Sequence, residues 1–471
     1  MLFRSPDAET TKPSAPPPRR PRRKLRHLLA IVLVVILSPF LVFALWSRVQ
    51  ASRLERALDA VEARGESVDV RTYAPGPVTP EQQQASALYD EFGRLTQDAR
   101  PARFAAAAAA VHALSSLTPE EAARDPRLAV LRNAEATYTG ALDLLERAAA
   151  LGARGVSGDR TQSFVGYGTA APSEVRIALR AFSGDGEGAA RALVALLRLR
   201  GVLLPIHAPY SGRTSDSLRL ILTFTRPALP VLEALQREYA AIETDPDVEA
   251  RMKYNRARFL SVVLPGQAGG QYTERRPTPI DLLLARAVTP LWTAGVIAEL
   301  RHYEAAIAAA RLPWPGRLDA ALALTEGWHR ANDSRAPKRS RWDALRRPWR
   351  ENIAAAEAIT LALSAAESLT RARASVAALA VTRYQRAHGG GLPGALADLV
   401  PEYLSGRLTD PYTGRELFYR RDGKGYRIYG AGANRRDDGG AWQLTSDLVT
   451  TQRGAAMDIG VAVPAPASAL Q

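Results

Sequence analysis

Residues 349–388 read WRENIAAAEAITLALSAAESLTRARASVAALAVTRYQRAH, a stretch of forty residues without glycine or proline. Alanine and leucine dominate it, and both residue types have a high helix propensity. The stretch therefore predicts one helix with a length of up to about 60 Å, at about 1.5 Å per residue. Gly389, Gly390 and Gly391 follow directly, and a run of glycines is a helix stop.

A small α+β module is predicted after this helix. Residues 392–404 have the pattern of a short helix, and residues 416–421 and 426–429 have the pattern of two strands. Asp422-Gly423-Lys424-Gly425 supplies the turn between the strands. Polar and apolar residues alternate along both strands, which is typical of a hairpin with one buried face.

The order of these pieces resembles a known family. LPGALADLVPEYL (392–404), LTDPYTGRELFYRR (408–421) and GYRIYGAGANRRDDGG (425–440) resemble the globular domain of the major pseudopilins of type II secretion systems. The correspondence covers residues 375–445, and the Asp410-Pro411-Tyr412-Thr413-Gly414 turn is among its most specific parts. The resemblance implies a pilin-like fold and a docking surface for pilin-like or secretion-system proteins.

The family's loop after the strands binds calcium through carboxylates and backbone carbonyls. The resemblance therefore implies a calcium site here, and oxygen ligands are what this cation needs. Its residues would be Asn434, Asp437, Asp438 and Asp447. The chain departs from the family at its start, because the apolar segment lies more than 300 residues upstream and no processing motif precedes it. We therefore expect kinship of fold without the pilus function itself.

The N-terminal region predicts a membrane anchor. Residues 28–46, LLAIVLVVILSPFLVFALW, carry no charge and are long enough to span a hydrocarbon core of about 30 Å. Six Arg and Lys residues precede this stretch between positions 19 and 26, so the positive-inside rule leaves the N-terminus in the cytoplasm. The alternative is a cleaved signal peptide with a cleavage site before Ser52, although secretory apolar regions have only about 7–15 residues. Either reading exports the remaining chain.

Composition excludes several classes of protein. The chain has 471 residues and no cysteine, so disulfides, thiol nucleophiles and cysteine metal sites are excluded. The formal charge of +14 rests on arginine, since only five of the 62 basic residues are lysine. The basic residues outside the N-terminal tail are dispersed, which is not the footprint of a nucleic-acid-binding protein. A stretch at 335–350 combines Trp342 and Trp349 with seven basic residues and favours a solvated linker or an anionic surface.

The region between the anchor and the long helix predicts a series of amphipathic helices separated by loops rich in glycine and proline. Three long loops, 157–173, 205–217 and 264–279, contain aromatic residues and hydroxyl groups. They are the candidate rim of a ligand cleft, in which case Phe164, Tyr167, Tyr210 and Tyr272 would surround one pocket. No metalloprotease, serine-hydrolase or phosphate-binding motif occurs in the sequence.

The sequence thus predicts a mainly α protein of the bacterial inner membrane, with a helical exported domain in the periplasm and a small C-terminal α+β pseudopilin-like module. The predicted function is a non-enzymatic envelope component that binds or positions a partner, linked to secretion or pilus-type assembly, without a cofactor other than calcium. Two alternatives stay open. One is a small-ligand or lipid receptor, and the other is a glycan hydrolase, which needs two acids about 5–9.5 Å apart. The candidate acids of the hydrolase are Glu299, Glu304 and Glu326.

The predicted regions are a disordered basic tail (1–27), a transmembrane signal anchor (28–46), an exported helical domain (47–348), a long helix with the module (349–446) and a flexible tail (447–471).

Overall fold

The computed structural model describes residues 22–73, 79–99, 101–152, 170–203, 211–243, 248–263, 279–331, 353–423, 425–441 and 458–464. Contacts divide the chain into two compact units. Unit 1 contains Met1–Ala60 and Arg275–Ile297, and unit 2 contains Val61–Glu274 and Ala298–Gln471. The predicted basic tail at 1–27 lies outside the described residues as far as position 21.

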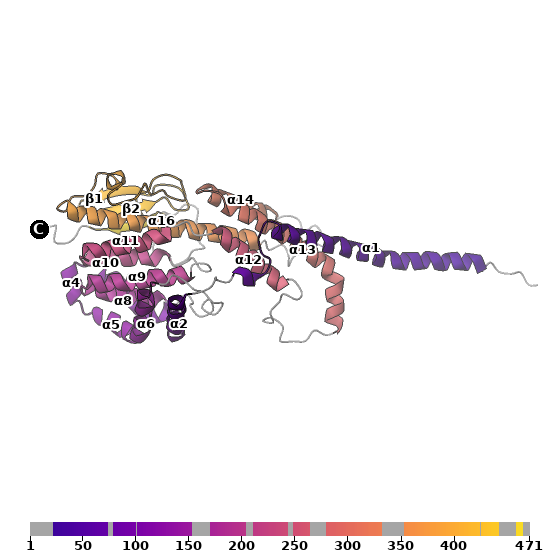
Figure 1. Cartoon of the computed structure of the whole chain (residues 1–471), viewed down its shortest axis with the longest axis horizontal. Coiled ribbons are helices and arrows are strands. Elements are labelled where there is room, and N and C mark those ends of the chain that lie inside the picture. The colour runs from indigo at the N-terminus through magenta and orange to yellow at the C-terminus, as the bar shows by residue number, and fades with distance from the viewer. Residues whose placement is uncertain are drawn as a thin grey trace, which may run out of the picture. The chain divides into compact units, whose positions relative to one another are not determined.

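Helix α1 (Arg22–Glu62) contains the apolar stretch predicted as the anchor (Figure 1). An 18-residue window within Ile31–Glu62 has a mean hydropathy of 2.2, and none of it is buried. Exposed fractions of 57% for Leu33 and 69% for Phe40 illustrate this. The prediction of an apolar N-terminal helix long enough to cross a membrane is therefore confirmed. Helix α1 continues without a break from this apolar stretch to Glu62, because no glycine or proline lies between Pro39 and Gly65.

Helix α13 (Pro279–Ala310) belongs to both units, with residues 279–297 in unit 1. The N-terminal part of unit 2 is helical. Its short elements are η1 (Val70–Tyr73), η2 (Pro101–Phe104) and α4 (Pro119–Arg124). Its longer helices are α2 (Pro80–Leu95), α3 (Ala105–Leu114), α5 (Leu128–Ala136), α6 (Thr139–Ala150), α8 (Ala170–Phe182), α9 (Gly186–Leu203), α10 (Ser211–Phe224) and α11 (Leu229–Glu243).

Helices α2 and α4 begin with capping boxes. Thr79 precedes α2, and its hydroxyl accepts a hydrogen bond from the Gln82 N–H while the Gln82 side chain accepts one from the Thr79 N–H. This capping box satisfies two N–H groups that a helix start otherwise leaves without partners. Buried apolar side chains of α6, α8 and α9, such as Leu145, Ile177 and Leu193, belong to the main hydrophobic core.

Helix α16 (Ile353–Ala387) confirms the long helix predicted within 349–388. It contacts α10, α11, α12 (Val248–Val263), α14 (Gly316–Ala331) and the sheet. Like α1, it is long and apolar enough to cross a membrane, but 56% of its apolar window is buried inside the protein. Alanines such as Ala366 and Ala377 are fully buried on it, so neighbouring helices can approach closely. Helix α16 is therefore the central core helix of unit 2.

The C-terminal module contains an antiparallel sheet in the order β1 (Phe418–Asp422), β2 (Gly425–Gly430) and β3 (Ile459–Val463). Tyr419 pairs with Ile428, and Tyr429 pairs with Gly460. The predicted hairpin is confirmed, and Figure 1 shows it beside α16. Residues 392–404, predicted as a short helix, contain only the 3-10 turn η4 (Leu396–Leu399).

The third strand differs from the prediction. Residues 447–471 were expected to form a flexible tail, but β3 pairs with β2 along its whole length. Val461 is 1% exposed and belongs to the main core. Burial of this apolar strand against α16 and α10 explains why it is ordered.

Candidate functional site

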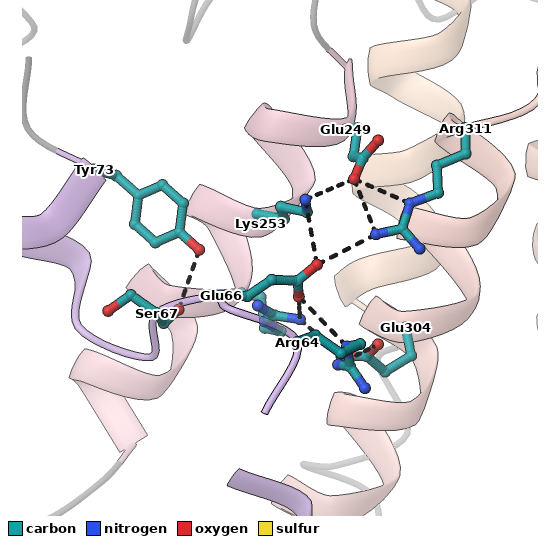
Figure 2. Close-up of polar contacts among 9 residues, drawn as sticks. Arg64, Glu66, Ser67, Tyr73, Glu249, Lys253, Glu304 and Arg311 are labelled. Atoms are coloured by element: carbon teal, nitrogen blue, oxygen red, sulfur yellow. Dashed lines mark hydrogen bonds and ion pairs between the residues drawn. The ribbon is translucent and has the colours of Figure 1, made fainter. Parts of the chain in front are cut away.

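A cluster of charged side chains lies around the buried Glu66, four residues after the end of α1 (Figure 2). The Glu66 side chain is only 7% exposed. One of its carboxylate oxygens lies 2.9 Å from Nη1 of Arg256, and the other lies 3.2 Å from Nζ of Lys253 and 3.2 Å from Nη2 of Arg311. Three cations therefore surround one carboxylate.

Two further acids complete the cluster. Oε1 of Glu249 lies 2.6 Å from Lys253 Nζ and 2.9 Å from Arg311 Nη2. Glu304 accepts a hydrogen bond of 2.7 Å from Arg256 and forms an ion pair of 2.7 Å with Arg64. The ion cluster, as we call it below, thus consists of Arg64, Glu66, Glu249, Lys253, Arg256, Glu304 and Arg311.

Helical spacing explains the arrangement. Glu249, Lys253 and Arg256 are at positions i, i+4 and i+7 of α12 and share one face of it. Glu304 and Arg311 are seven residues apart on α13. The pairs Glu249–Arg311 and Arg256–Glu304 form because the two helices run antiparallel there.

The segment that carries Glu66 is shaped by a glycine. Gly65 has a φ of +74°, and its N–H donates a hydrogen bond of 2.8 Å to the Glu62 carbonyl. A residue in this left-handed conformation is a common helix end, and glycine adopts it without steric cost. The chain then leaves the helix, and η1 packs on α12 with Tyr73 edge-on to Tyr254. The Tyr73 hydroxyl donates to the Ser67 carbonyl at 3.1 Å (Figure 2).

The electrostatics of the cluster favour the charged forms of Glu66 and Glu249. Burial acts to raise the pKa of the Glu66 carboxyl, but hydrogen bonds from Arg256 and Lys253 outweigh burial, and the pKa lies below its ordinary value. A hydrogen bond from Lys253 likewise lowers the pKa of Glu249. The Arg256 side chain has no exposed surface at all. Fixed, mutually paired charges hold segments together, whereas an acid or base catalyst needs a pKa near the working pH.

A second polar group lies on the neighbouring face of α12. The Tyr303 hydroxyl donates a hydrogen bond of 3.0 Å to Glu357 of α16, and Asn255 also bonds this carboxyl. Burial raises the pKa of Glu357 despite these bonds. Burial also lowers the pKa of Arg251 to about 10, and this guanidinium lies over the ring of Tyr254.

The structure does not bring the three acids of the hydrolase hypothesis into one site. Glu299 is 5% exposed and accepts a hydrogen bond from the Ala354 N–H at the start of α16. Glu304 belongs to the ion cluster, and Glu326 is an exposed residue of α14. Each acid therefore has a different environment.

Phe164, Tyr167, Tyr210 and Tyr272 lie outside the described residues, as does the basic stretch 335–350. The prediction of a ligand pocket at these loops stays a prediction.

The predicted calcium loop is largely described, apart from Asp447. Oδ1 of Asp437 accepts hydrogen bonds of 2.9 Å from the Tyr429 hydroxyl and from the Gly439 N–H. Its Oδ2 pairs with Arg420 at 2.6 Å. Asn434 donates a hydrogen bond of 2.7 Å to Asp438. Hydrogen-bond donors of the protein thus already occupy carboxylate oxygens that calcium would need. The calcium site stays a prediction.

Within the described ranges, no group of three or more His, Cys, Asp or Glu side chains is arranged to hold a metal ion. Asp458, an acid that the sequence did not single out, contacts the predicted calcium loop: it is 1% exposed and accepts a hydrogen bond of 2.7 Å from the Gly440 N–H. Its contact fixes the end of the loop beside β3.

The Asp410-Pro411-Tyr412-Thr413-Gly414 turn has a structural role. The Asp410 carboxylate accepts hydrogen bonds from the N–H groups of Tyr412 (3.1 Å) and Ala431 (3.2 Å) and from the Thr413 hydroxyl (2.9 Å). The Tyr412 side chain is buried with residues of α14 and α16. The turn therefore joins the module to the helices.

Sequence reasoning did not select Glu66 or Arg256. The spacing of Glu249, Lys253 and Arg256 was a detectable signal for a charged helix face. Glu66 gave none, because it is a single acid in a loop and its partner Arg311 is 245 residues away in the chain. Comparison with protein-family models, with curated proteins and with solved structures finds no match to this chain.

Proposed function

We propose that this protein is a single-pass protein of the bacterial inner membrane, with its N-terminus in the cytoplasm and its helical domain in the periplasm. In this proposal it is a non-enzymatic envelope component that binds or positions a partner. The observation that carries the proposal is the ion cluster, which binds the segment directly after α1 to α12 and α13. Paired charges thus fix the first segment of the exported domain to helices of the same domain.

Charge distribution supports the orientation. Eight of the chain's basic residues and only two acids precede position 28, directly before the apolar part of α1. Basic residues next to a membrane helix favour the cytoplasmic side. The exported side then contains both the ion cluster and the C-terminal module.

The pairing of the acids supports a non-enzymatic role. Glu66, Glu249 and Glu304 are each within 3.2 Å of a cationic nitrogen of the same chain. Glu299 is occupied at the start of α16. These carboxylates stabilise the domain, so they are not free to exchange protons with a substrate.

The proposed partner class comes from the C-terminal module. Its sequence resembles major pseudopilins, and its hairpin lies against a long helix as such a resemblance would imply. We propose that the module docks pilin-like or secretion-system proteins in the envelope.

Topology can be tested cleanly because the chain has no cysteine. Single replacements Ser5→Cys in the N-terminal tail and Ser183→Cys, an exposed residue after α8, provide one reporter on each side. In spheroplasts, a membrane-impermeant maleimide is expected to label Ser183→Cys, and to label Ser5→Cys only after lysis. The reverse pattern contradicts the proposed orientation.

The partner can be tested by gentle detergent extraction of the tagged full-length chain, followed by mass spectrometry. The control is a fusion of residues 1–62 to a reporter domain, which retains α1 without the exported domain. Stoichiometric recovery of pilin-like or secretion proteins by the full chain alone supports docking. Equal recovery with both chains, or recovery of the protein by itself, contradicts it.

A further inference from the structure

Helix α1 has a buried side in the part that follows its apolar stretch. Gln50 and Val61 are 7% and 2% exposed, and Leu54 is half-buried. At about 100° per residue, these three residues lie within about 40° of one another around the helix axis. This side of α1 therefore packs against other parts of the protein.

Another side of the same segment carries three exposed arginines. Arg48, Ser52 and Arg56 are at positions i, i+4 and i+8 and share one face, with Arg53 beside it. The arginines lie within about 140° of one another, and Gln50 is about 200° from Arg48. Within the part of the chain that the structure describes, none of the three arginines forms an ion pair.

These arginines directly follow the exposed apolar stretch. Leu41 and Leu45 are 72% and 64% exposed, and Trp46 ends the stretch with an aromatic ring of the kind found at membrane interfaces. At 1.5 Å per residue, the Cα atom of Arg48 lies about 3 Å beyond Trp46. The headgroup layer on each side of a bilayer is about 5–7 Å thick. If α1 spans the bilayer, Arg48 therefore lies within that layer.

The other two arginines are one to two turns further along the helix. Helical side chains tilt toward the helix N-terminus, which is the direction of the apolar stretch. Arg56 shows this tilt, because its Nε donates a hydrogen bond of 3.0 Å to the Ser52 carbonyl, one turn nearer to the stretch. Arg53 and Arg56 are thus within the distance of about 8–10 Å over which an anionic surface attracts exposed charges.

We propose that Arg48, Arg53 and Arg56 bind the headgroups of anionic phospholipids in the leaflet on the exported side of the membrane. This inference rests on the proposed membrane anchorage. Charge complementarity supports it, because no acid occurs between positions 10 and 54 and the first acid after the apolar stretch is Glu55. The lipid-facing side of α1 then continues from the acyl chains into the headgroup layer, while its other side holds the protein.

The test uses the full chain reconstituted in phosphatidylcholine vesicles that contain a trace of spin-labelled lipid. Electron paramagnetic resonance measures the fraction of labelled lipid that the protein immobilises. Labelled phosphatidylglycerol, which is anionic, is compared with labelled phosphatidylcholine, which is zwitterionic, and the ratio gives the preference for the anionic headgroup. The basic N-terminal tail is the same in every variant, so differences between variants report on the arginines after the apolar stretch.

We expect the triple replacement Arg48→Gln, Arg53→Gln and Arg56→Gln to lower this preference by about five-fold, the effect of about one basic residue at an anionic surface. Replacement of the same three arginines by lysine should keep the preference, because the charge is retained. The control is a glutamine triple variant at arginines elsewhere whose side chains are 60–82% exposed: Arg71, Arg94 and Arg103. It should leave the ratio unchanged.

An unchanged ratio in the glutamine variant of α1 overturns the headgroup site and leaves the anchor intact. An equal loss in the control overturns it as well, because total charge would then explain the preference. An equal loss in the lysine variant overturns the role of charge. If the wild-type chain immobilises neither lipid, the proposed anchorage fails and this inference fails with it. The three side chains are exposed, so each variant should keep the wild-type melting temperature.

Discussion

Oε1 of Glu299 lies 2.7 Å from the backbone nitrogen of Ala354 and accepts its hydrogen bond at the start of α16. A helix start carries N–H groups without helical partners and a partial positive charge. An acid from α13 therefore supplies an acceptor for an N–H group in the first turn of the central helix.

Replacing Glu299 by alanine is expected to lower the free energy of unfolding by about 1–2 kcal/mol, because a buried N–H loses its acceptor. Glu326→Ala, an exposed acid on α14, is the matched control and is expected to change stability by less than about 0.5 kcal/mol. Denaturant unfolding measures both. Equal effects would show that Glu299 does not cap α16.

Glu66→Gln is expected to destabilise the protein by about 3–5 kcal/mol, because Arg256 is fully buried and loses its central counter-charge. Arg64→Gln removes an ion pair whose side chains are 40% and 37% exposed, and it is expected to cost only about 0–1 kcal/mol. Denaturant unfolding of both variants gives the comparison. A loss at Glu66 no larger than that at Arg64 would contradict the central role of Glu66.

The pH dependence of the Glu66 contribution follows from its lowered pKa. The folded pKa lies below the unfolded value of about 4.3, so the stabilisation is complete above the unfolded value and is lost as the pH falls through the folded one. The difference in unfolding free energy between wild type and Glu66→Gln should therefore be constant from pH 6 to 8 and shrink below about pH 4. A difference that grows on acidification would reverse the assigned sign.

Glu357 is expected to behave in the opposite way, because burial raises its pKa. Its folded state binds a proton more readily than its unfolded state, so its contribution is most favourable at low pH and is lost as the pH rises through the folded pKa. Glu357→Gln keeps an oxygen for the Tyr303 hydroxyl and avoids a buried charge. It should raise the melting temperature at pH 8 and have little effect at pH 4, with the partly buried Glu367→Gln of α16 as the control. A lower melting temperature at pH 8 would show that the charged form is needed.

Local signals in the sequence predicted the elements whose interactions are local. The absence of glycine and proline predicted α16, and the alternation around Tyr426 and Ile428 predicted the hairpin. The apolar run in α1 was equally clear, because a membrane segment needs only length and composition.

Long-range pairing explains what the sequence did not reveal. Strand β3 has only five residues and pairs with a strand about thirty positions earlier. No short turn connects the two strands, so the sequence contains no turn motif that would predict β3. The ion cluster depends on Glu66 meeting Arg256 and Arg311, which are far away in the chain. Glu299 was selected as an acid, but its role as a cap depends on where α16 begins in space.

The close approach of β2 and β3 gives a direct test of the third strand. Gly460 faces Tyr429, and a Cβ atom at position 460 would lie 2.1 Å from the Ile428 carbonyl oxygen and 2.6 Å from the Tyr429 Cα. Backbone atoms give way less easily than side chains, so Gly460→Ala must displace β3. We expect a loss of about 1–3 kcal/mol in unfolding free energy and faster amide hydrogen exchange at Val461. Gly406→Ala is the matched control, because a Cβ at position 406 has no atom within 4 Å. If both variants are equally stable and Val461 exchanges as in the wild type, β3 is not held against β2 in solution.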